Sequence, residues 1–267
     1  MKIRRSLANR SSLDCWFSTA GGIKLPGGNK SGFNHPEIRL FIAFSSLTFS
    51  PLSAIFRTVY RSPSFAGVIL AAGESLRMGR DKALLPWPPG ELQTVRKDTF
   101  LSAAIRSLSL STDFVLVVAG KNEAELAPIA YVNAATVIRN SDPSRGQFSS
   151  LQIGLQEVLN RGRDAAIITL VDRPPAPANV VHMLRERFEA APQNIWAVVP
   201  EFEGRHGHPF AAGREMIERF LREPLSGNAR DVEHRYQEHI EYVTVSEPSV
   251  ALNVNTPEDY AKLAQPS

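Results

Sequence analysis

From residue 65 onward, short apolar runs alternate with segments of helical periodicity. The apolar runs span residues 68–71, 114–119, 136–138, 165–171 and 196–199. Helical patterns lie between or after them at 148–159, 181–188 and, behind an expected N-cap at Asp98, 99–110. Short, nearly all-apolar strands that alternate with helices are typical of a parallel sheet covered on both faces. We therefore expect an α/β fold: a single three-layer, doubly wound domain with a mostly parallel central sheet.

The C-terminal part of the chain does not continue the strand–helix alternation. Two helices and then a strand pair are expected there, at residues 214–222, 228–237, 242–245 and 250–252. Thr256 is a typical N-cap, Pro257 suits the first helical position, and two acidic residues follow in the first turn. A helix is therefore expected to begin at Pro257, which leaves Asn255 on the loop between strand and helix.

Residues 1–64 make a poor folding unit because they mix Gly, Ser, Asn and Pro with scattered apolar residues. Nine Lys or Arg residues stand there against two acidic residues, so the segment is basic. It is either a poorly ordered basic N-terminal extension or the product of a start assigned too far upstream, with the true start near residues 59–65. The rest of the chain carries more acidic than basic residues, which argues against a nucleic-acid-binding domain.

Cys15 is the one cysteine of the sequence, which excludes disulfides within the chain and zinc sites built on cysteines. The sequence has no run of about 18 apolar residues, so no membrane-spanning helix is expected. Apolar residues make up 43% of the chain and charged residues 21%, as in ordinary soluble globular proteins. We therefore expect a cytoplasmic protein that binds neither nucleic acid nor membrane.

The stretch 67–82 joins the first apolar run to a glycine-bearing loop with two separated cations, Arg77 and Lys82. In such a loop, backbone N–H groups can face phosphate oxygens, glycines allow close approach, and cations neutralise charge. It is not the common phosphate loop, because five residues separate Gly73 from Gly79. It is not a dinucleotide fingerprint either, because it contains no G-x-G-x-x-G. The loop predicts a polyphosphate site of another kind.

Ligands of such sheets bind beyond the carboxyl ends of the strands, which selects the loops after residues 71, 138, 171 and 199. Asp172 follows a central apolar run and precedes two prolines, so it can hold a metal, or it can form a turn or cap a helix. Asn255 offers a neutral oxygen of the kind that Mg²⁺ accepts, although a turn residue is the simpler interpretation of Asn255 alone.

Two further polar groups could contact a ligand. His206 and His208 flank Gly207, but two histidines without a third ligand make a weak zinc argument, so substrate contact or plain solvation is the better interpretation. The second group lies where the loop after residue 138 enters the next helix, and it comprises Arg145, Gln147, Ser149 and Ser150. These side chains can contact the base or the ribose of a nucleotide, or they can cap the helix N-terminus.

Residues 70–82, Leu-Ala-Ala-Gly-Glu-Ser-Leu-Arg-Met-Gly-Arg-Asp-Lys, resemble the L-A-A-G-x-S-x-R-M-G-x-x-K element of molybdenum cofactor cytidylyltransferases and their relatives in the MobA-like nucleotidyltransferase superfamily. Further elements follow in the family's order at 146–155, Asp172 with its prolines, 207–209, 227–230 and 255–259. The resemblance covers about residues 66–263. It implies a Rossmann-like nucleotidyltransferase domain at 65–264, with a nucleotide half at about 65–175 and an acceptor half at about 176–264.

The resemblance also implies roles for single residues. The catalytic residues would be Arg77 and Lys82, on the phosphates, and Asp172. Asp172 would hold Mg²⁺, with Asn255 as the second protein ligand. The acceptor would lie against Gly207, His208 and Pro209. The nucleotide would contact Leu70, Ala71, Ala72, Gly73, Ser75, Gly79, Lys82, Gly146, Ser149 and Ser150.

The chain departs from the family pattern on both sides of the metal Asp and at Asn255, where cytidylyltransferases often carry Asp. Family members commonly have Gly or Cys before the metal Asp and Gln or Met after it, whereas this chain has Val171 and Arg173. The guanylyl-transferring relatives usually read L-A-G-G, so Ala72 favours CTP over GTP.

The activity that the resemblance implies is Mg²⁺-dependent transfer of a nucleotidyl group from CTP, or less favourably GTP, to a phosphorylated acceptor. That acceptor would be molybdopterin carrying molybdenum, pyrophosphate would be released, and the product would pass to a molybdoenzyme or chaperone. Two alternatives stay open. The chain could serve another phosphorylated acceptor, such as a sugar phosphate, or it could be a non-catalytic chaperone that binds molybdenum cofactor.

Overall fold

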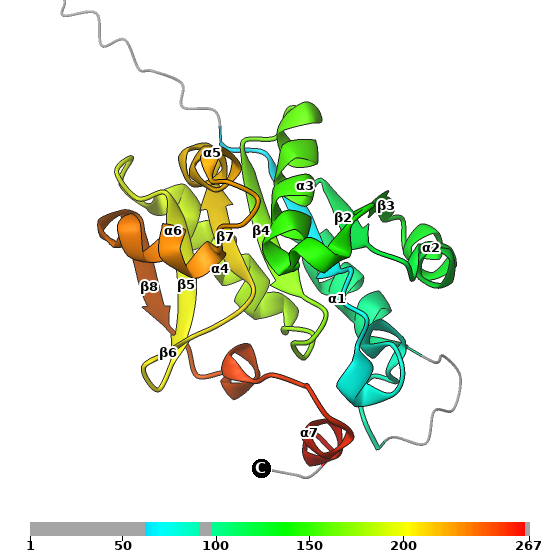
Figure 1. Cartoon of the computed structure of the whole chain (residues 1–267). Coiled ribbons are helices and arrows are strands. Elements are labelled where there is room, and N and C mark those ends of the chain that lie inside the picture. Colours follow the sequence, from blue (N-terminus) through cyan, green and yellow to red (C-terminus); the bar gives the residue numbers. More distant parts are fainter. Residues whose placement is uncertain (1–61, 91–97, 265–267) are drawn as a thin grey trace, which may run out of the picture. The chain divides into compact units, whose positions relative to one another are not determined.

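The computed structural model of the chain describes residues 62–90 and 98–264. The expectations for residues 1–61 therefore lie outside the described residues. The described residues belong to one compact unit, which consists of a central sheet between two layers of helices (Figure 1). This arrangement is the three-layer α/β fold that the alternation of patterns predicts.

In the described part of the chain, the sheet has eight strands in the order β3-β2-β1-β4-β7-β5-β6, with β8 paired to β5. The strands are β1 (Phe65–Ala71), β2 (Phe114–Ala119), β3 (Thr136–Arg139), β4 (Ala165–Leu170), β5 (Ala197–Phe202), β6 (Arg205–His206), β7 (Phe210–Gly213) and β8 (Ile240–Thr244). Parallel pairs join β1 to β2 and β4, β2 to β3, and β5 to β8, whereas β7 runs antiparallel between β4 and β5. The sheet is therefore mostly parallel, as expected.

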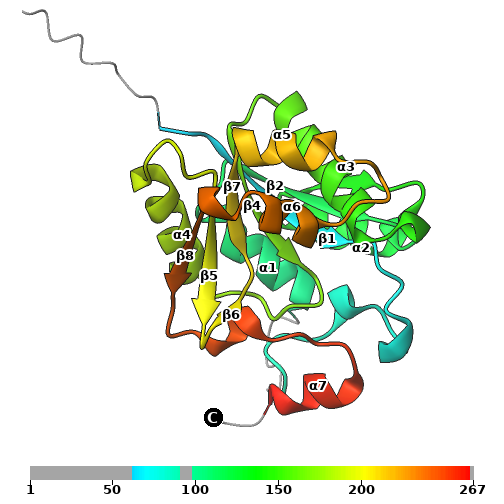
Figure 2. The same cartoon turned by 60° about the vertical axis from the view of Figure 1, so that its left-hand side comes forward.

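Helices cover both faces of the sheet (Figure 2). The helices of the described residues are α1 (Phe100–Ser109), α2 (Glu123–Val132), α3 (Gln147–Asn160), α4 (Ala178–Ala190), α5 (Arg214–Arg222), α6 (Ala229–Arg235) and α7 (Pro257–Lys262), of which α7 lies apart from the sheet. Strand β1 is buried along its whole length and sends alternate side chains to the two faces. Ile69 joins the core beneath α1 and α4 with Leu184, and Val68 joins the core beneath α3 and α5 with Leu155.

The strand order creates the place where a ligand can bind. From β1 the chain runs outward to β2 and β3, and it then crosses back to β4 on the other side of β1. The carboxyl ends of β1 and β4 are therefore neighbours, with Leu70 opposite Leu170, and the loops that leave them diverge. In doubly wound sheets, this switch point is where ligands bind.

Four segments differ from the expectations. Residues 250–252 form no strand but belong to a 3₁₀ turn, Pro248–Ala251, because a proline suits its first position and Glu247 accepts a hydrogen bond from the Ser249 N–H. Helix α2, which contains Pro128, was not expected, and neither were β6 and β7, which are too short to show a pattern. The other expected elements are present, with ends that shift by a few residues.

The N-cap of α1 is Thr99 and not Asp98. Thr99 and Ser102 form a reciprocal capping box, in which each side chain accepts a hydrogen bond from the other residue's backbone N–H. Asp98 instead forms an ion pair with Arg106, at 2.6 Å. The prediction was wrong because both candidates suit an N-cap, and only the second has a partner three residues later.

The folded region begins slightly before residue 65. The backbone N–H and the hydroxyl of Ser64 both donate to Oδ2 of Asp164, at 3.1 and 2.7 Å. Ser64 therefore takes part in the packing of the domain, although the sequence pattern assigned it to the extension. No helix among the described residues is long and apolar enough to cross a membrane.

Gly154 sets how closely α3 packs on the sheet. A Cβ at this position would lie 2.8 Å from Cγ1 of Val68 and 3.0 Å from Cγ2 of Val118. Overpacking costs roughly 1–3 kcal/mol, which exceeds the gain of about 1 kcal/mol that alanine brings to a helix. We expect Gly154→Ala to lower the free energy of unfolding by about 1 kcal/mol in urea denaturation. The loss should shrink in a Val68→Ala background, and a more stable Gly154→Ala variant would contradict this packing.

Candidate active site

The loop after β1 adopts the tight conformation that its glycines suggest. Ser75 and Gly79 both have positive φ values, 50° and 71°, and bracket a 3₁₀ turn, Leu76–Met78. Gly79 adopts this conformation without steric cost because it has no Cβ. The backbone N–H of Lys82 donates to the Ser75 hydroxyl at 3.2 Å, so the loop closes on itself.

Gly120 and Asn122, which follow β2, support this loop. The Asn122 side chain donates to the Ala71 carbonyl at 2.9 Å and accepts from the Gly120 N–H at 2.9 Å. A Cβ on Gly120 would lie 2.7 Å from the Ala72 carbonyl oxygen, so a glycine is required for this close approach. Sequence reasoning missed both residues, although their place beyond the carboxyl end of a central strand was a usable signal.

Lys82 and Arg77 converge on Asn255, which lies in the loop before α7. Lys82 Nζ donates to Asn255 Oδ1 at 3.0 Å, and an Arg77 guanidinium nitrogen lies 3.4 Å from the same oxygen. Asp259 fixes the loop because its Oδ2 accepts from the N–H groups of Asn255 and Thr256, at 3.0 and 3.1 Å. The predicted N-cap at Thr256 is confirmed.

A small apolar cluster holds α7 against the segment that follows β1. Met78, Phe100 and Val254 are buried in it, and Tyr260 packs on it. The Tyr260 hydroxyl also donates to the Pro86 carbonyl at 2.7 Å. This packing brings the C-terminal end of the sequence back to the first loop of the domain.

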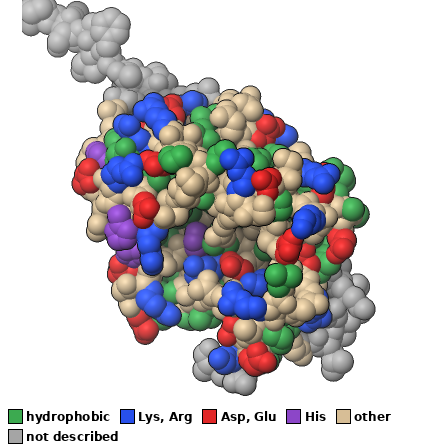
Figure 3. Space-filling model, in the orientation of Figure 1, with side chains coloured by type: hydrophobic (Ala, Val, Ile, Leu, Met, Phe, Trp, Pro, Cys, Tyr) green, Lys and Arg blue, Asp and Glu red, His purple; other side chains and the backbone are tan. Residues whose placement is uncertain are grey.

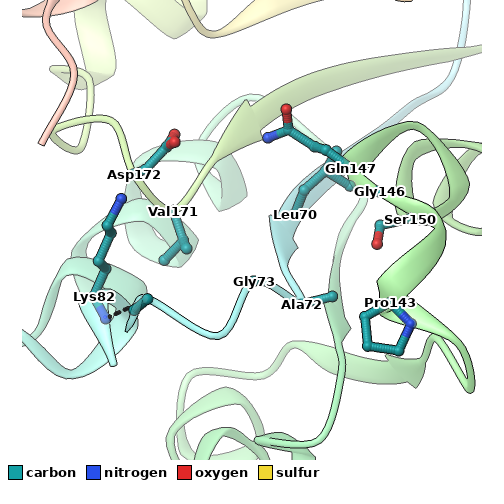
Figure 4. A pocket seen from close by; sticks show the side chains of 11 residues that line it. Leu70, Ala72, Gly73, Lys82, Pro143, Gly146, Gln147, Ser150, Val171 and Asp172 are labelled. Atoms are coloured by element: carbon teal, nitrogen blue, oxygen red, sulfur yellow. Dashed lines mark hydrogen bonds between the residues drawn. The ribbon is translucent and has the colours of Figure 1, made fainter. Parts of the chain in front are cut away.

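Asp172 lies at the end of β4, where the sequence places it. Its backbone carbonyl accepts from the Val254 N–H at 2.8 Å, which ties this loop to the segment that carries Asn255. The Asp172 Oδ1 atom is buried, and no described residue gives it a hydrogen bond. The Lys82 side chain extends toward Asp172 (Figure 4). Burial lowers the pKa of Lys82, and the charge of Asp172 offsets part of that effect.

The start of α3 supplies the opposite wall. Gly146 has a φ of 91° and precedes the helix without a side-chain cap, so the capping interpretation does not describe this segment. Ser149 and Ser150 are buried, and the side chain of Asn140 donates to both hydroxyl oxygens, at 3.0 and 2.9 Å. Asn140 directly follows β3 and was not among the predicted residues.

These segments enclose a pocket with a volume of about 150 Å³ (Figure 4). The predicted residues that line it are Leu70, Ala72, Gly73, Ser75, Lys82, Gly146, Ser150 and Asp172. The other predicted residues of this group do not line it: Ala71, Arg77, Gly79, Ser149 and Asn255. The structure therefore brings the loops after β1, β3 and β4 together at one edge of the sheet.

A larger pocket of about 320 Å³ adjoins the first and shares Leu70, Gly146 and Gln147 with it. Its apolar walls include Phe148, Leu151, Ile168, Leu170 and Phe210. Its polar lining includes Arg145, His208, Asn228 and Glu233. Figure 3 shows a hollow near the middle of this face with basic, acidic and histidine side chains beside it.

Of the three residues predicted to contact the acceptor, His208 lines the larger pocket, whereas Gly207 and Pro209 do not. Gly207 packs so closely on the 3₁₀ turn Pro248–Ala251 that a Cβ would lie 2.7 Å from the Val250 carbonyl oxygen. Steric demand therefore accounts for a glycine at this position.

Residues 67–240 match the family described as the MobA-like NTP transferase domain. The matched region includes the loop after β1, the start of α3, Asp172 and His208, all of which contribute residues to the two pockets. The chain belongs to this family. It is therefore a nucleotidyltransferase.

Relatives of this MobA-like domain carry names from molybdenum cofactor biosynthesis. A probable molybdenum cofactor guanylyltransferase of Rhodopirellula baltica is 28% identical over 206 residues, 74% of this chain and 90% of the relative. The molybdenum cofactor cytidylyltransferase of Escherichia coli is 25% identical over 195 residues, 72% of this chain and 92% of the relative. Two crystal structures of Rv0371c from Mycobacterium tuberculosis, the second in complex with manganese, share the fold. Their TM-scores are 0.62 and 0.56, at 23% and 22% identity, over 76% and 75% of this chain and 100% and 98% of theirs.

Arg173 directly follows Asp172 and is one of the residues that depart from the expected family pattern. It is half-buried, and one guanidinium nitrogen donates to the Leu252 carbonyl at 3.2 Å. Burial lowers the pKa of Arg173, and the neighbouring charge of Asp172 acts in the opposite direction. Arg173 therefore ties the loop after β4 to the segment that leads to Asn255.

His208 carries no charge at neutral pH in this MobA-like domain. Burial, followed by the charge of Arg173, lowers the pKa of His208 to about 3, against a smaller opposite effect of the Ile168 carbonyl. The His208 Nδ1 atom is buried and has no hydrogen-bond partner among the described residues. A neutral ring with a free nitrogen suits a contact with an uncharged polar atom of a ligand.

This lowered pKa makes folding stability depend on pH. A histidine in the unfolded chain takes up a proton near pH 6.5, whereas folded His208 does so only near 3. Acid therefore favours the unfolded state, and stability should fall below about pH 6.5 by up to about 1.4 kcal/mol per pH unit. His208→Gln should flatten this decline between about pH 6.5 and 5 in urea denaturation. His206→Gln, at an exposed position in the neighbouring strand β6, is the matched control and should leave the decline unchanged. An unchanged decline in His208→Gln would contradict the lowered pKa.

Proposed function

We propose that this MobA-like nucleotidyltransferase transfers the cytidylyl group of CTP to a phosphate of molybdopterin and releases pyrophosphate. The observation that carries the proposal is the junction of the two pockets, which share Leu70, Gly146 and Gln147. One pocket offers Lys82 and Asp172, and the other offers apolar walls with a few polar groups. A nucleoside triphosphate in the first and a phosphorylated ring compound in the second would meet at this junction.

In the proposed reaction, an oxygen of the acceptor phosphate attacks the α-phosphorus of CTP. A bond between this oxygen and the α-phosphorus forms while the bond to the oxygen bridging the α- and β-phosphates breaks. Pyrophosphate leaves with that electron pair. Because a phosphate nucleophile is already ionised near neutral pH, no protein base is needed. Catalysis then rests on positioning and charge neutralisation, which Lys82 and Arg77 would provide.

Asp172 would hold Mg²⁺. The residue fits this role because its Oδ1 atom is buried and accepts no hydrogen bond from a described residue. Asn255 offers a second oxygen, which also accepts hydrogen bonds from Lys82 and Arg77. The described residues hold no group of three or more His, Cys, Asp or Glu suited to a metal, so phosphates and water would complete the coordination shell. When bound, Mg²⁺ would neutralise charge on the reacting phosphates. The manganese complex of Rv0371c supports a divalent cation in this fold.

Ala72 supports CTP as the nucleotide. It stands where guanylyl-transferring relatives usually have the first Gly of L-A-G-G, and it is buried and lines the smaller pocket. The names of the relatives do not separate the two nucleotides, because guanylyl- and cytidylyltransferases match at 28% and 25% identity. The choice of CTP therefore rests on Ala72 alone.

The larger pocket supports a flat, heteroaromatic acceptor. Phe148, Leu151 and Phe210 give it apolar walls, while Asn228 and Glu233 offer hydrogen-bonding groups. Burial raises the pKa of Glu233, and the charges of His234 and Arg230 act against this. Apolar surfaces with a few placed polar groups are typical of pockets that bind small organic ligands, and the pterin part of molybdopterin is such a ligand.

The test of this proposal measures pyrophosphate release from CTP and from GTP with Mg²⁺, in the presence and absence of molybdopterin. We expect release that requires the acceptor and is faster with CTP. Release from neither nucleotide, despite tight binding of molybdopterin, would identify a non-catalytic chaperone. Release that depends on a sugar phosphate and not on molybdopterin would show that the acceptor is of another kind.

A further inference from the structure

We infer that Asn140 is a positioning residue that commits the Ser150 hydroxyl to donate a hydrogen bond to the nucleotide base. The inference rests on the proposed function, because it concerns how the same site reads its nucleotide. Asn140 lies just beyond β3 and is only 3% exposed, so the side chain does not contact bulk solvent freely. Its backbone N–H donates to the Ala119 carbonyl at 2.8 Å, which anchors it to the end of β2.

The orientation of the Asn140 amide follows from one backbone contact. Its Oδ1 atom accepts from the N–H of Asp142 at 3.0 Å. A backbone N–H can only donate, so the amide oxygen must face Asp142 and the amide nitrogen must face the serines. The alternative orientation would place two donors against each other.

The amide nitrogen then fixes the direction of the next hydrogen bonds. Asn140 Nδ2 lies 3.0 Å from the Ser149 oxygen and 2.9 Å from the Ser150 oxygen, so its two hydrogens serve the two serines. Because an amide nitrogen only donates, both hydroxyl oxygens accept here. Ser149 passes its own hydrogen to the Gly146 carbonyl at 2.8 Å.

The hydrogen of the Ser150 hydroxyl has no acceptor among residues 62–90 and 98–264. Ser150 is 3% exposed, yet it lines the smaller pocket. A buried donor without a partner costs about 1–3 kcal/mol, so an acceptor on a bound ligand would stabilise the complex. The network therefore presents a donor, and not an acceptor, to whatever occupies this end of the pocket.

The base is the part of the nucleotide that would meet Ser150. In Figure 4, Lys82 and Asp172 lie on one side of the pocket and Ser150 lies on the other, with Gly73 and Ala72 between them. The phosphates belong at the cationic side, which leaves the base at the Ser150 side. Cytosine offers two acceptors, O2 and N3, on the edge that a hydroxyl donor can reach.

The substitution Asn140→Asp tests whether Ser150 donates to the base, because it reverses the hydrogen bond between residue 140 and Ser150 and changes the shape of the side chain very little. The carboxylate can still accept from the Asp142 N–H, but it can no longer donate to Ser150. The Ser150 hydroxyl would then donate its hydrogen to the carboxylate, so it could only accept a hydrogen bond from the base and no longer donate one. We expect the dissociation constant for CTP, measured by calorimetry, to rise about tenfold to a hundredfold. Binding of inorganic tripolyphosphate, which has no base, should stay the same.

A double-mutant cycle separates this role from a general structural one. In a Ser150→Ala background, Asn140→Asp should have little further effect on CTP binding. Ser149→Ala is the matched control, because Ser149 is equally buried and equally bonded to Asn140 but does not line the pocket. In that background the full effect of Asn140→Asp should remain. Thermal unfolding shows whether Asn140→Asp is folded. If it is not, Ser150→Ala alone must weaken the binding of CTP and leave the binding of tripolyphosphate unchanged.

Equal effects of Asn140→Asp in the wild-type and Ser150→Ala backgrounds, or an equal loss of tripolyphosphate binding, would overturn the inference. If the wild-type protein turns over GTP in preference to CTP, the cycle is measured with GTP, whose base also carries acceptors. A wild-type protein that turns over nucleotide but shows no coupling would refute this inference alone. A wild-type protein that binds neither nucleotide would refute the proposed function as well.

Discussion

Asp172→Asn is expected to slow Mg²⁺-dependent pyrophosphate release by about a hundredfold or more, with the fold intact. The substitution removes the negative charge that would hold the metal but keeps the shape of the side chain. Because no described residue donates a hydrogen bond to Asp172 Oδ1, the substitution removes no hydrogen bond at that atom. The measurement is the steady-state rate across a Mg²⁺ titration, together with thermal unfolding of the variant.

Asp142→Asn is the matched control for this prediction. Asp142 is an exposed carboxylate in the loop after β3 and does not line either pocket. Its substitution should leave the rate and the Mg²⁺ dependence close to those of the wild type. Near-normal Mg²⁺-dependent activity in Asp172→Asn would show that the metal is held elsewhere.

Lys82→Ala is expected to cause a loss of similar size, about a hundredfold or more in kcat/KM for CTP. Lys82 is 8% exposed, lines the smaller pocket and extends toward Asp172 (Figure 4). A buried ammonium group stabilises developing charge on phosphate more strongly than one in water, because the surroundings screen it less. The loss should appear in kcat as well as in KM if the contact is strongest in the transition state.

Arg80→Ala provides the comparison for Lys82. Arg80 belongs to the same loop but is exposed, and its guanidinium lies 5.9 Å from the centre of the Tyr260 ring. The neutral Arg80 variant should keep most of the activity. Equal losses in the two variants would mean that the loop acts through its total charge and that Lys82 has no specific contact with the phosphates.

The sequence was sufficient to predict the sheet and the segments that form the site. Strands β1 and β4 are buried on both faces, so their apolar runs end sharply where the chain leaves the sheet. Asp172, just beyond β4, and Lys82, a cation in the glycine-bearing loop that follows β1, were therefore visible as candidates. The N-cap at Thr256 was equally readable, because capping depends on residues that are close in sequence.

The residues that sequence reasoning missed act through contacts between distant segments. Asn122 supports the loop of another strand, and Asn140 joins the end of β3 to the start of α3. An isolated Asn between a strand and a helix also suits a turn, so its type alone carries little information. Strand β7 was missed for a related reason, since four small or apolar residues show neither period clearly.

The most direct test of nucleotidyl transfer follows radioactive label from CTP through one turnover with Mg²⁺ and molybdopterin. If the protein transfers the cytidylyl group, label at the α-phosphorus appears in the acceptor product, and label at the γ-phosphorus appears in an equal amount of pyrophosphate. Transfer of the γ-label to the acceptor, or α-label that never enters the acceptor product, would contradict the proposed reaction.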